Sequence, residues 1–274
     1  MQELLEAPGP ALDAIQPAFA QQLYFIYSAD EGFAVKNILP LFKDSRRAEF
    51  VWNAYLYFAR CDNKLLSAGL LDAINFEWTH LDKLREKSLR TSFFSLVISI
   101  LSFSDISTES RDTLLRESVI SMDGKHSADF AEAVARFLTG EDIEASVVWD
   151  NWLGKHIANR LRGIPRKATH FELSKWADTV SFLKDRIPEA AAFFKGKEIG
   201  FCKGFPYADL PMDVAKAYPE ELLDHFLERI KNTSPQELPT GYRIKKLVEA
   251  MRNAVGNDPA DTLIAAAREA GFHL

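Results

Sequence analysis

Apolar residues recur with a helical period along the whole chain, in segments separated by short breaks. We expect each segment to form a helix that buries one face. One clear stripe contains Val148, Trp149, Trp152, Leu153, Ile157 and Leu161. The predicted helices cover residues 10–27, 31–41, 46–61, 63–76, 79–103, 108–122, 127–139, 141–162, 170–186, 188–195, 211–217, 219–231, 241–255 and 259–271.

The composition favours helices over strands. The chain has 33 Ala and 31 Leu but only 11 Val, so strong helix formers far outnumber this β-branched residue. A sandwich, a barrel or a parallel sheet is therefore disfavoured. Helices joined by short breaks pack as antiparallel neighbours. We predict an all-α fold, either an irregular, solenoid-like stack of helical repeats or a multi-helix bundle of antiparallel helical pairs.

Several predicted helices carry their own start or stop signals. Thr169 followed by Glu172 forms a capping box, in which side chains bind the free N–H groups of the first turn. Asp258 before Pro259 predicts an N-cap followed by a first-position proline. Gly140 is placed to end the helix before it.

Two tryptophan-bearing segments resemble each other. Val51–Leu56 and Val148–Leu153 both read Val-Trp, then Asn or Asp, any residue, an aromatic residue and Leu. A structural repeat is one interpretation, but no regular period of repeats runs through the chain. The alternative, which we favour, is two core helices that each bury a tryptophan. The five tryptophans could also form a ligand cage, but their helical spacing favours the core.

The segment Lys195–Pro206 contains three glycines and three lysines and is the clearest break in the chain. A phosphate-binding loop is one interpretation, but the glycine spacing differs from that pattern and no strand is predicted before it. We expect a loop between subdomains. The predicted division gives a larger helical subdomain, 1–198, and a smaller one, 199–274, packed on it or continuous with it.

Charge and cysteine content indicate the compartment and disfavour some partners. The formal net charge of −6 repels polyanions, so nucleic acid is a disfavoured partner unless a local patch binds it. Two distant cysteines suit a reducing compartment, and the acidic start lacks the features of a signal peptide.

The apolar run Phe93–Phe103 is about half a bilayer span. We predict a cytoplasmic protein with no membrane segment, in which this run is a buried helix.

The sequence shows no familiar catalytic pattern. None of its six histidines has metal-ligand spacing, the cysteines form no Cys-x-x-Cys motif, and no Gly-x-Ser-x-Gly motif occurs. His225 lies near Glu221, Asp224 and Glu228, which could tune it as a base, but a solvated helix face is the favoured interpretation. We predict no catalytic residue, no metal site and no cofactor, and therefore no enzyme.

One basic patch stands out in this acidic chain. Five cations occur within thirteen residues without an acidic residue between them: Lys155, Arg160, Arg162, Arg166 and Lys167. The patch could bind a phosphate backbone, a nucleotide or an acidic surface of a partner. The alternative is structural, because cations suit the C-terminal end of a helix and pair with acids of neighbouring helices.

Three parts of the chain share patterns of Trp, Leu and Gly-Pro residues with a known family. The first part is Val51–Arg60 with Leu65 and Leu66. The second comprises Trp152, Leu153, Arg160–Pro165, Glu172, Trp176 and Pro188–Ala190. The third comprises Tyr218–Glu220, the helix to Ile230, Leu247 and Val248. Together they resemble a helical domain of unknown function that, in bacterial anti-phage defence proteins, commonly lies C-terminal to a Sir2-like NAD-consuming domain, and the resemblance spans roughly residues 15–272.

The resemblance implies a helical module that senses, scaffolds or regulates, with the NAD chemistry carried by another domain. The chain lacks the Gly-Ala-Gly dinucleotide loop that Sir2-like domains need. We therefore predict a non-enzymatic interaction module of an anti-phage system, whose partner is a phage protein or an associated effector domain. The alternative is a nucleotide- or nucleic-acid-binding domain that uses the basic patch. A third hypothesis is an architectural role as a homo-oligomer.

Overall fold

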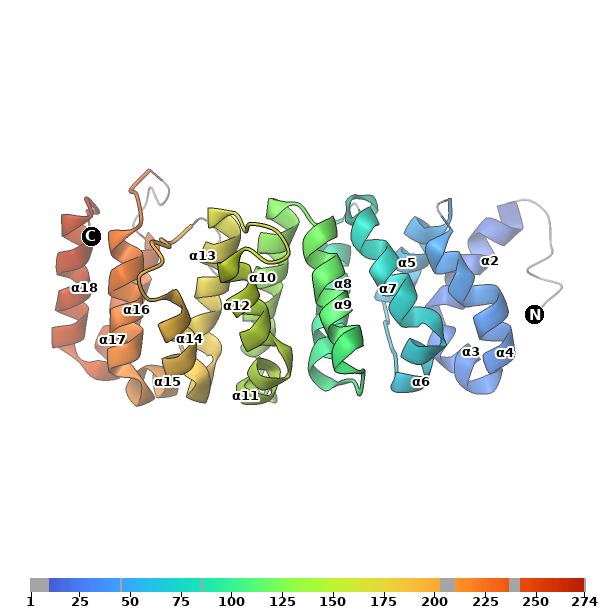
Figure 1. The fold of residues 1–274 in the computed structure, drawn as a ribbon, viewed down its shortest axis with the longest axis horizontal. Helices are drawn as coiled ribbons and strands as arrows, with labels where there is room; N and C mark the ends of the chain where they lie inside the picture. The colour runs from blue at the N-terminus through green and yellow to red at the C-terminus, as the bar shows by residue number, and fades with distance from the viewer. Residues whose placement is uncertain (1–9, 45, 85, 203–209, 237–241, 274) are drawn as a thin grey trace. The chain divides into compact units, whose positions relative to one another are not determined.

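The computed structural model describes residues 10–44, 46–84, 86–202, 210–236 and 242–273. Every element of these residues is a helix or helical turn, and none is a strand, which confirms the all-α prediction (Figure 1). The chain divides into two compact units, Met1–Met122 and Asp123–Leu274. The predicted boundary near residue 200 instead lies inside the second unit.

Unit 1 is built from short helices and two longer ones. Its elements are α2 (Pro10–Gln21), α3 (Leu23–Ala29), α4 (Glu31–Phe33), η1 (Ala34–Ile38), η2 (Leu39–Lys43), α5 (Ala48–Leu56), α6 (Asn63–Leu65), η3 (Leu66–Leu70), α7 (Leu71–Glu77), η4 (Trp78–Lys83), α8 (Lys87–Phe103) and α9 (Thr108–Ser121). Helix α5 packs on α2 and α8, and α7 packs on α9. Helices η1 and η3 are π-helical turns, and η2 and η4 are 3₁₀-helical.

An aromatic cluster forms the core of unit 1. The Trp52 ring lies edge-on to Phe42 at 4.8 Å and to Phe93 at 5.5 Å between ring centroids. Its indole Nε1 donates a hydrogen bond to the Phe42 carbonyl oxygen at 3.2 Å. Trp78 packs edge-on to Phe93 at 5.0 Å. These contacts join η2, α5, η4 and α8.

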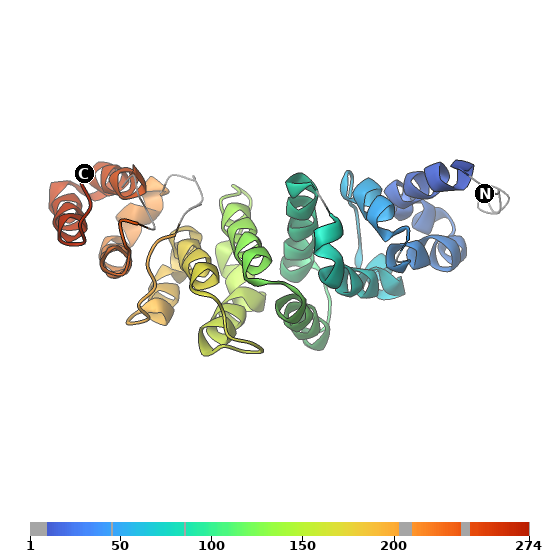
Figure 2. The ribbon, with the colours of Figure 1, turned by 90° about the horizontal axis from the view of Figure 1, so that it is seen from above.

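Unit 2 carries the remaining elements. They are α10 (Gly124–Leu138), α11 (Ala145–Val148), η5 (Trp149–Leu153), α12 (Gly154–Arg162), α13 (His170–Asp178), η6 (Thr179–Phe182), η7 (Lys184–Arg186), α14 (Ile187–Phe194), α15 (Met212–Ala217), α16 (Pro219–Lys231), α17 (Tyr242–Val255) and α18 (Asn257–Glu269). Helix α13 packs on α10 and α12, and α14 packs on α16. Figure 2 shows the last helices, coloured orange to red, side by side, and α18 packs on both α16 and α17.

The predicted helices agree with the observed ones, apart from their boundaries. The expected helix 79–103 is interrupted, because 3₁₀ helix η4 ends at Lys83 and α8 begins at Lys87. Helix α18 begins at Asn257 after Gly256, so Asp258 is not its N-cap. Thr169 does cap α13, since its hydroxyl accepts a hydrogen bond from the Glu172 N–H at 3.1 Å.

The two similar tryptophan segments share a burial pattern but differ in backbone. Trp52 and Trp149 are both buried, and so are the aromatic residues three positions later, Tyr55 and Trp152. The first segment belongs to α-helix α5, whereas the second forms the π-helical turn η5. All five tryptophans are buried, which confirms them as core residues.

The apolar run Phe93–Phe103 lies in α8, and most of its large side chains are buried, as predicted. Among the described residues, no helix has both the length and the apolar character needed to cross a bilayer.

Candidate interaction surfaces

An open groove in unit 1 is bordered by α3, by the turn that follows α5, and by α8. Its volume is about 740 Å³. Tyr24 of α3 lines it together with Tyr57, Phe58 and Arg60 of the turn. We call this concavity the aromatic groove.

The aromatic groove exposes side chains that a helical core would normally bury. Tyr57 is 75% exposed and Phe58 61% exposed, and their rings meet edge-on at 5.4 Å. Phe25 is 53% exposed beside Tyr24, and the Arg60 guanidinium lies 5.4 Å from the centroid of the Phe25 ring. Scattered exposed apolar residues are ordinary, but a cluster of exposed aromatics beside an arginine is typical of binding surfaces.

Local packing explains why these residues face solvent. Helix α5 turns Val51, Trp52 and Tyr55 toward the core and ends at Leu56. The Tyr55 hydroxyl then donates a hydrogen bond to the Arg60 carbonyl oxygen at 2.7 Å, which ties the following turn back to the helix. Between Tyr55 and Arg60, the side chains of Tyr57 and Phe58 therefore extend outward from a backbone that is held at both ends.

The α8 side of the aromatic groove is polar and uncharged. Thr91, Ser95 and Ser99 repeat at the four-residue spacing that places side chains on one helix face. The Thr91 hydroxyl donates to the Lys87 carbonyl oxygen and the Ser99 hydroxyl to the Ser95 carbonyl oxygen, both at 2.9 Å. Their oxygens keep lone pairs that can accept hydrogen bonds from a ligand.

The thiol that borders this groove is a poor nucleophile. Burial, assisted by the charge of Asp62, raises the pKa of Cys61 to about 11. Since the thiolate is the reactive form, Cys61 stays largely unreactive at neutral pH. The groove is therefore suited to non-covalent binding.

In the structure, one of the five cations of the predicted basic patch is buried and the other four are not. The Arg160 side chain is fully buried, and its guanidinium Nε lies 2.6 Å from Oε1 of buried Glu172. Arg160 Nη2 donates to the other Glu172 oxygen at 3.2 Å. The prediction of Arg160 as a binding cation is therefore corrected: it forms a structural ion pair between α12 and α13. The capping box is also incomplete, because the Glu172 carboxylate binds Arg160.

The other four cations lie nearer the surface. Arg162, Lys155 and Lys167 are exposed, and Arg166 is half-buried. Arg166 Nη2 donates to the Ser127 hydroxyl of α10 at 3.0 Å. Their role in binding stays a prediction, and the five cations do not form one continuous surface.

The two buried histidines of unit 2 are neutral imidazoles. Burial, with the nearby charge of Arg160, lowers the pKa of His156 to about 3. Burial, with Arg229, lowers the pKa of His225 to about 3, and its Nε2 lies 3.1 Å from the Ala177 carbonyl oxygen. His225 therefore does not belong to a solvated face as predicted, although Glu221 and its other acidic neighbours line a shallow groove of about 330 Å³ between α14 and α16.

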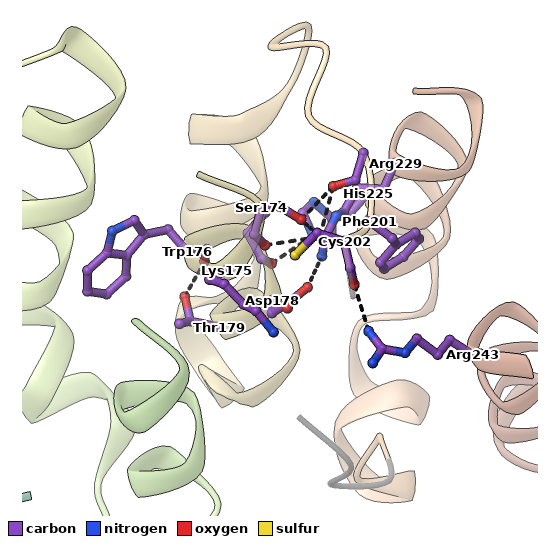
Figure 3. A network of polar contacts seen from close by, with 12 residues as sticks. Ser174, Lys175, Trp176, Asp178, Thr179, Phe201, Cys202, His225, Arg229 and Arg243 are labelled. Carbon is purple, nitrogen blue, oxygen red and sulfur yellow. Dashed lines mark hydrogen bonds and ion pairs between the residues drawn. The ribbon is translucent and has the colours of Figure 1, made fainter. Parts of the chain in front are cut away.

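A buried polar network joins α13, α16 and the segment before residue 203 (Figure 3). Arg229 Nη1 donates to Asp178 Oδ1 at 2.6 Å, and Nη2 donates to the Ser174 carbonyl oxygen at 3.0 Å. The Arg229 guanidinium also lies 4.0 Å from the centroid of the Phe201 ring. This network fixes Gly200 and Phe201 against α13 and α16.

Figure 3 also places Arg243 and Cys202 together, with Arg243 Nη1 donating to the Cys202 carbonyl oxygen at 2.6 Å. Burial raises the pKa of the Cys202 thiol, and the charge of Asp178 adds to that shift. Gly204 of the predicted glycine-rich loop lies outside the described residues.

The described part of the chain contains no group of His, Cys, Asp and Glu side chains placed to hold a metal ion. Comparisons with protein-family models, curated proteins and solved structures found no match. Two exposed surfaces are candidates for binding a partner: the aromatic groove and the residues around the loop between α12 and α13.

Proposed function

We propose that this chain is a helical partner-binding module that holds a segment of another protein in the aromatic groove of unit 1. The observation that carries the proposal is the cluster formed by Tyr57, Phe58, Phe25 and Arg60 beside the polar face of α8. Aromatic residues and arginine contribute most of the binding energy at protein interfaces. The hydrogen bond from the Tyr55 hydroxyl to the Arg60 carbonyl oxygen holds the turn that carries Tyr57 and Phe58 in place. Less conformational entropy is therefore lost when a partner binds.

The resemblance to helical domains of Sir2-containing defence proteins suggests a setting for this module. In that setting the partner is a phage protein or an associated effector domain, and the module is a sensor, regulator or scaffold. A second copy of the chain is the other partner that we consider.

Site-specific photocrosslinking tests the proposal. A photoreactive amino acid replaces Tyr57 in one variant, Phe58 in a second and exposed Ile120 of α9 in a control. We expect the two groove variants to form a shared crosslinked product in cells that make the protein, and the control to lack it. Mass spectrometry of the product separates a phage protein, a host protein and a second copy of the chain.

Substitutions supply the matched experiment. We expect Tyr57→Ser and Phe58→Ser to change the free energy of unfolding by less than about 0.5 kcal/mol, because both side chains are exposed. The same changes should reduce recovery of the crosslinked partner by about tenfold or more. Equal recovery with the groove variants and Ile120→Ser would refute the assignment of the groove.

A further inference from the structure

The buried side chain of Arg160 holds the loop between α12 and α13 of unit 2 in one conformation. We call residues 162–171, which are this loop with the last residue of α12 and the first two of α13, the basic loop. Arg160 Nη1 donates to the carbonyl oxygens of Ile164 and Arg166, each at 2.8 Å, while the rest of its guanidinium binds Glu172. One buried side chain thus fixes both the loop backbone and the start of α13.

The beginning of the basic loop is also fixed by the end of α12. Gly163 adopts a left-handed conformation with φ of 77°, which a glycine tolerates without strain. The Ile164 N–H then donates to the Asn159 carbonyl oxygen at 2.9 Å. A loop anchored in this way presents its side chains with little entropy left to lose on binding.

The anchored loop exposes large apolar side chains. Ile164 is 47% exposed and Phe171 39% exposed, and Pro165 is exposed between them in sequence. Lys175 Nζ, one turn further along α13, lies 5.8 Å from the centroid of the Phe171 ring. The basic loop therefore offers apolar contact area as well as charge.

Two exposed cations flank these apolar residues. Arg162 donates to the Ala158 carbonyl oxygen at 3.2 Å and to Asn159 Oδ1 at 2.6 Å, which are both uncharged. Neither Arg162 nor Lys167 forms an ion pair with a residue that the structure describes. No acidic residue occurs between Asp150 and Glu172, and Glu172 is buried.

One acidic residue near the loop is Asp123. Asp123 precedes Gly124, which packs against the Thr169 side chain. Its carboxylate accepts a hydrogen bond from the His126 N–H at 2.7 Å and caps α10. The Asp123 carboxylate is thus bound to the start of α10 and not to Arg162 or Lys167.

We infer that the basic loop binds an acidic peptide segment that also carries a large apolar side chain. Carboxylates would pair with Arg162 and Lys167, and the apolar side chain would cover Ile164 and Phe171. The chain's net charge of −6 opposes a long polyanion such as a nucleic acid but has less effect on a short acidic segment held locally. This site is in unit 2 and does not depend on the aromatic groove.

Fluorescence anisotropy with defined probes tests the inference. The probes are a labelled Glu–Tyr copolymer, polyglutamate of matched length and an oligothymidylate of matched charge. We expect the copolymer to bind most tightly, because it supplies both carboxylates and aromatic rings. Its affinity should also fall with added salt, because screening weakens charge pairing.

Surface variants keep the test independent of folding. We expect the double substitution Arg162→Gln and Lys167→Gln to weaken copolymer binding by about tenfold or more. A control with the same charge change, Lys197→Gln and Lys216→Gln, alters exposed lysines elsewhere in unit 2 and should leave binding unchanged. Phe171→Ser should weaken the copolymer more than it weakens polyglutamate.

Three results would overturn the inference. The first is no binding of the copolymer by the wild-type chain. The second is tighter binding of oligothymidylate than of the copolymer, which would indicate a phosphate-backbone site. The third is an equal loss in the control and loop variants, which would indicate unspecific attraction to cations.

Discussion

A buried carboxyl in unit 1 makes the stability of this protein depend on pH near neutrality. The Glu77 side chain at the end of α7 is 1% exposed, and neither carboxylate oxygen has a hydrogen-bond partner among the described residues. Burial raises its pKa from 4.5 to about 8; Lys83 opposes this shift and Glu49 adds to it. At neutral pH, folded Glu77 is therefore predominantly protonated.

The sign of the pH effect follows from proton binding. Between pH 4.5 and about 8, folded Glu77 keeps a proton that the unfolded chain releases. The free energy of unfolding therefore falls as pH rises through this window, and the stabilisation is complete only below pH 4.5. At about 1.4 kcal/mol per pH unit, the loss reaches about 3 kcal/mol by pH 7.

The substitution Glu77→Gln replaces the ionisable carboxyl with an uncharged amide of nearly the same shape. We expect the variant to be about 3 kcal/mol more stable than the wild type at pH 7 and similar to it near pH 4. Urea denaturation from pH 4 to 8, followed by the fluorescence of neighbouring Trp78, measures the difference. Glu109→Gln, at an exposed position of α9, is the control and should keep the wild-type slope. A Glu77→Gln variant that is less stable than the wild type at pH 7 would refute the reasoning.

Two further predictions concern unit 2. Arg160→Met leaves Glu172 buried without its cation and should cost about 3–5 kcal/mol in chemical denaturation. In the double variant Arg160→Met/Glu172→Leu, most of that stability should be recovered. A double variant that loses as much unfolding free energy as the two single variants together would contradict this. Gly200→Ala places a methyl group 2.7 Å from the carbonyl carbon of Asn232 and should cost about 3 kcal/mol or more. Gly196→Ala, where no atom lies within 4 Å but φ is +70°, should cost about 1 kcal/mol, and equal costs at the two glycines would contradict the steric argument.

The helical fold was predictable because periodicity is a local property of the sequence. The predicted and observed helices coincide closely from 108 to 138 and from 211 to 231. The sequence did not reveal the break between Lys83 and Lys87, because no glycine or proline marks it. The period of apolar residues also does not predict the π-helical turn Trp149–Leu153, because a π turn shifts the helical register by one residue.

The domain division was harder to predict, because it depends on contacts between residues far apart in sequence. The glycines near residue 200 indicate a flexible joint when they are considered alone. In the structure, Gly200 is buried where its carbonyl oxygen accepts a hydrogen bond from the Ser174 hydroxyl at 2.7 Å. Glycine there permits close approach to Asn232. Composition does not distinguish these two uses of glycine.

The aromatic groove was missed, although the sequence contains a signal for it. Tyr24-Phe25 and Tyr57-Phe58 are pairs of adjacent aromatics in helical or turn segments. Neighbouring residues on a helix point about 100° apart. An adjacent pair is buried only where the helix has a wide buried face, as at Phe93 and Phe94 of α8, whereas Tyr57 and Phe58 are both exposed. Only the tertiary packing of α3 beside the turn after α5 brings Tyr24 into one groove with Tyr57 and Phe58, and Arg60 over the Phe25 ring.

The basic patch shows why a count of charges is a poor guide to a binding site. Arg160 binds Glu172 and the carbonyl oxygens of Ile164 and Arg166, and its burial withdraws its charge from solvent. Its contribution to the proposed site is instead positional, because it holds the backbone from which Arg162 and Lys167 extend. A cation that anchors a loop and a cation that binds a ligand are the same residue type in the sequence. Only the position of Glu172, twelve residues later and buried against Arg160, distinguishes the anchor from its neighbours.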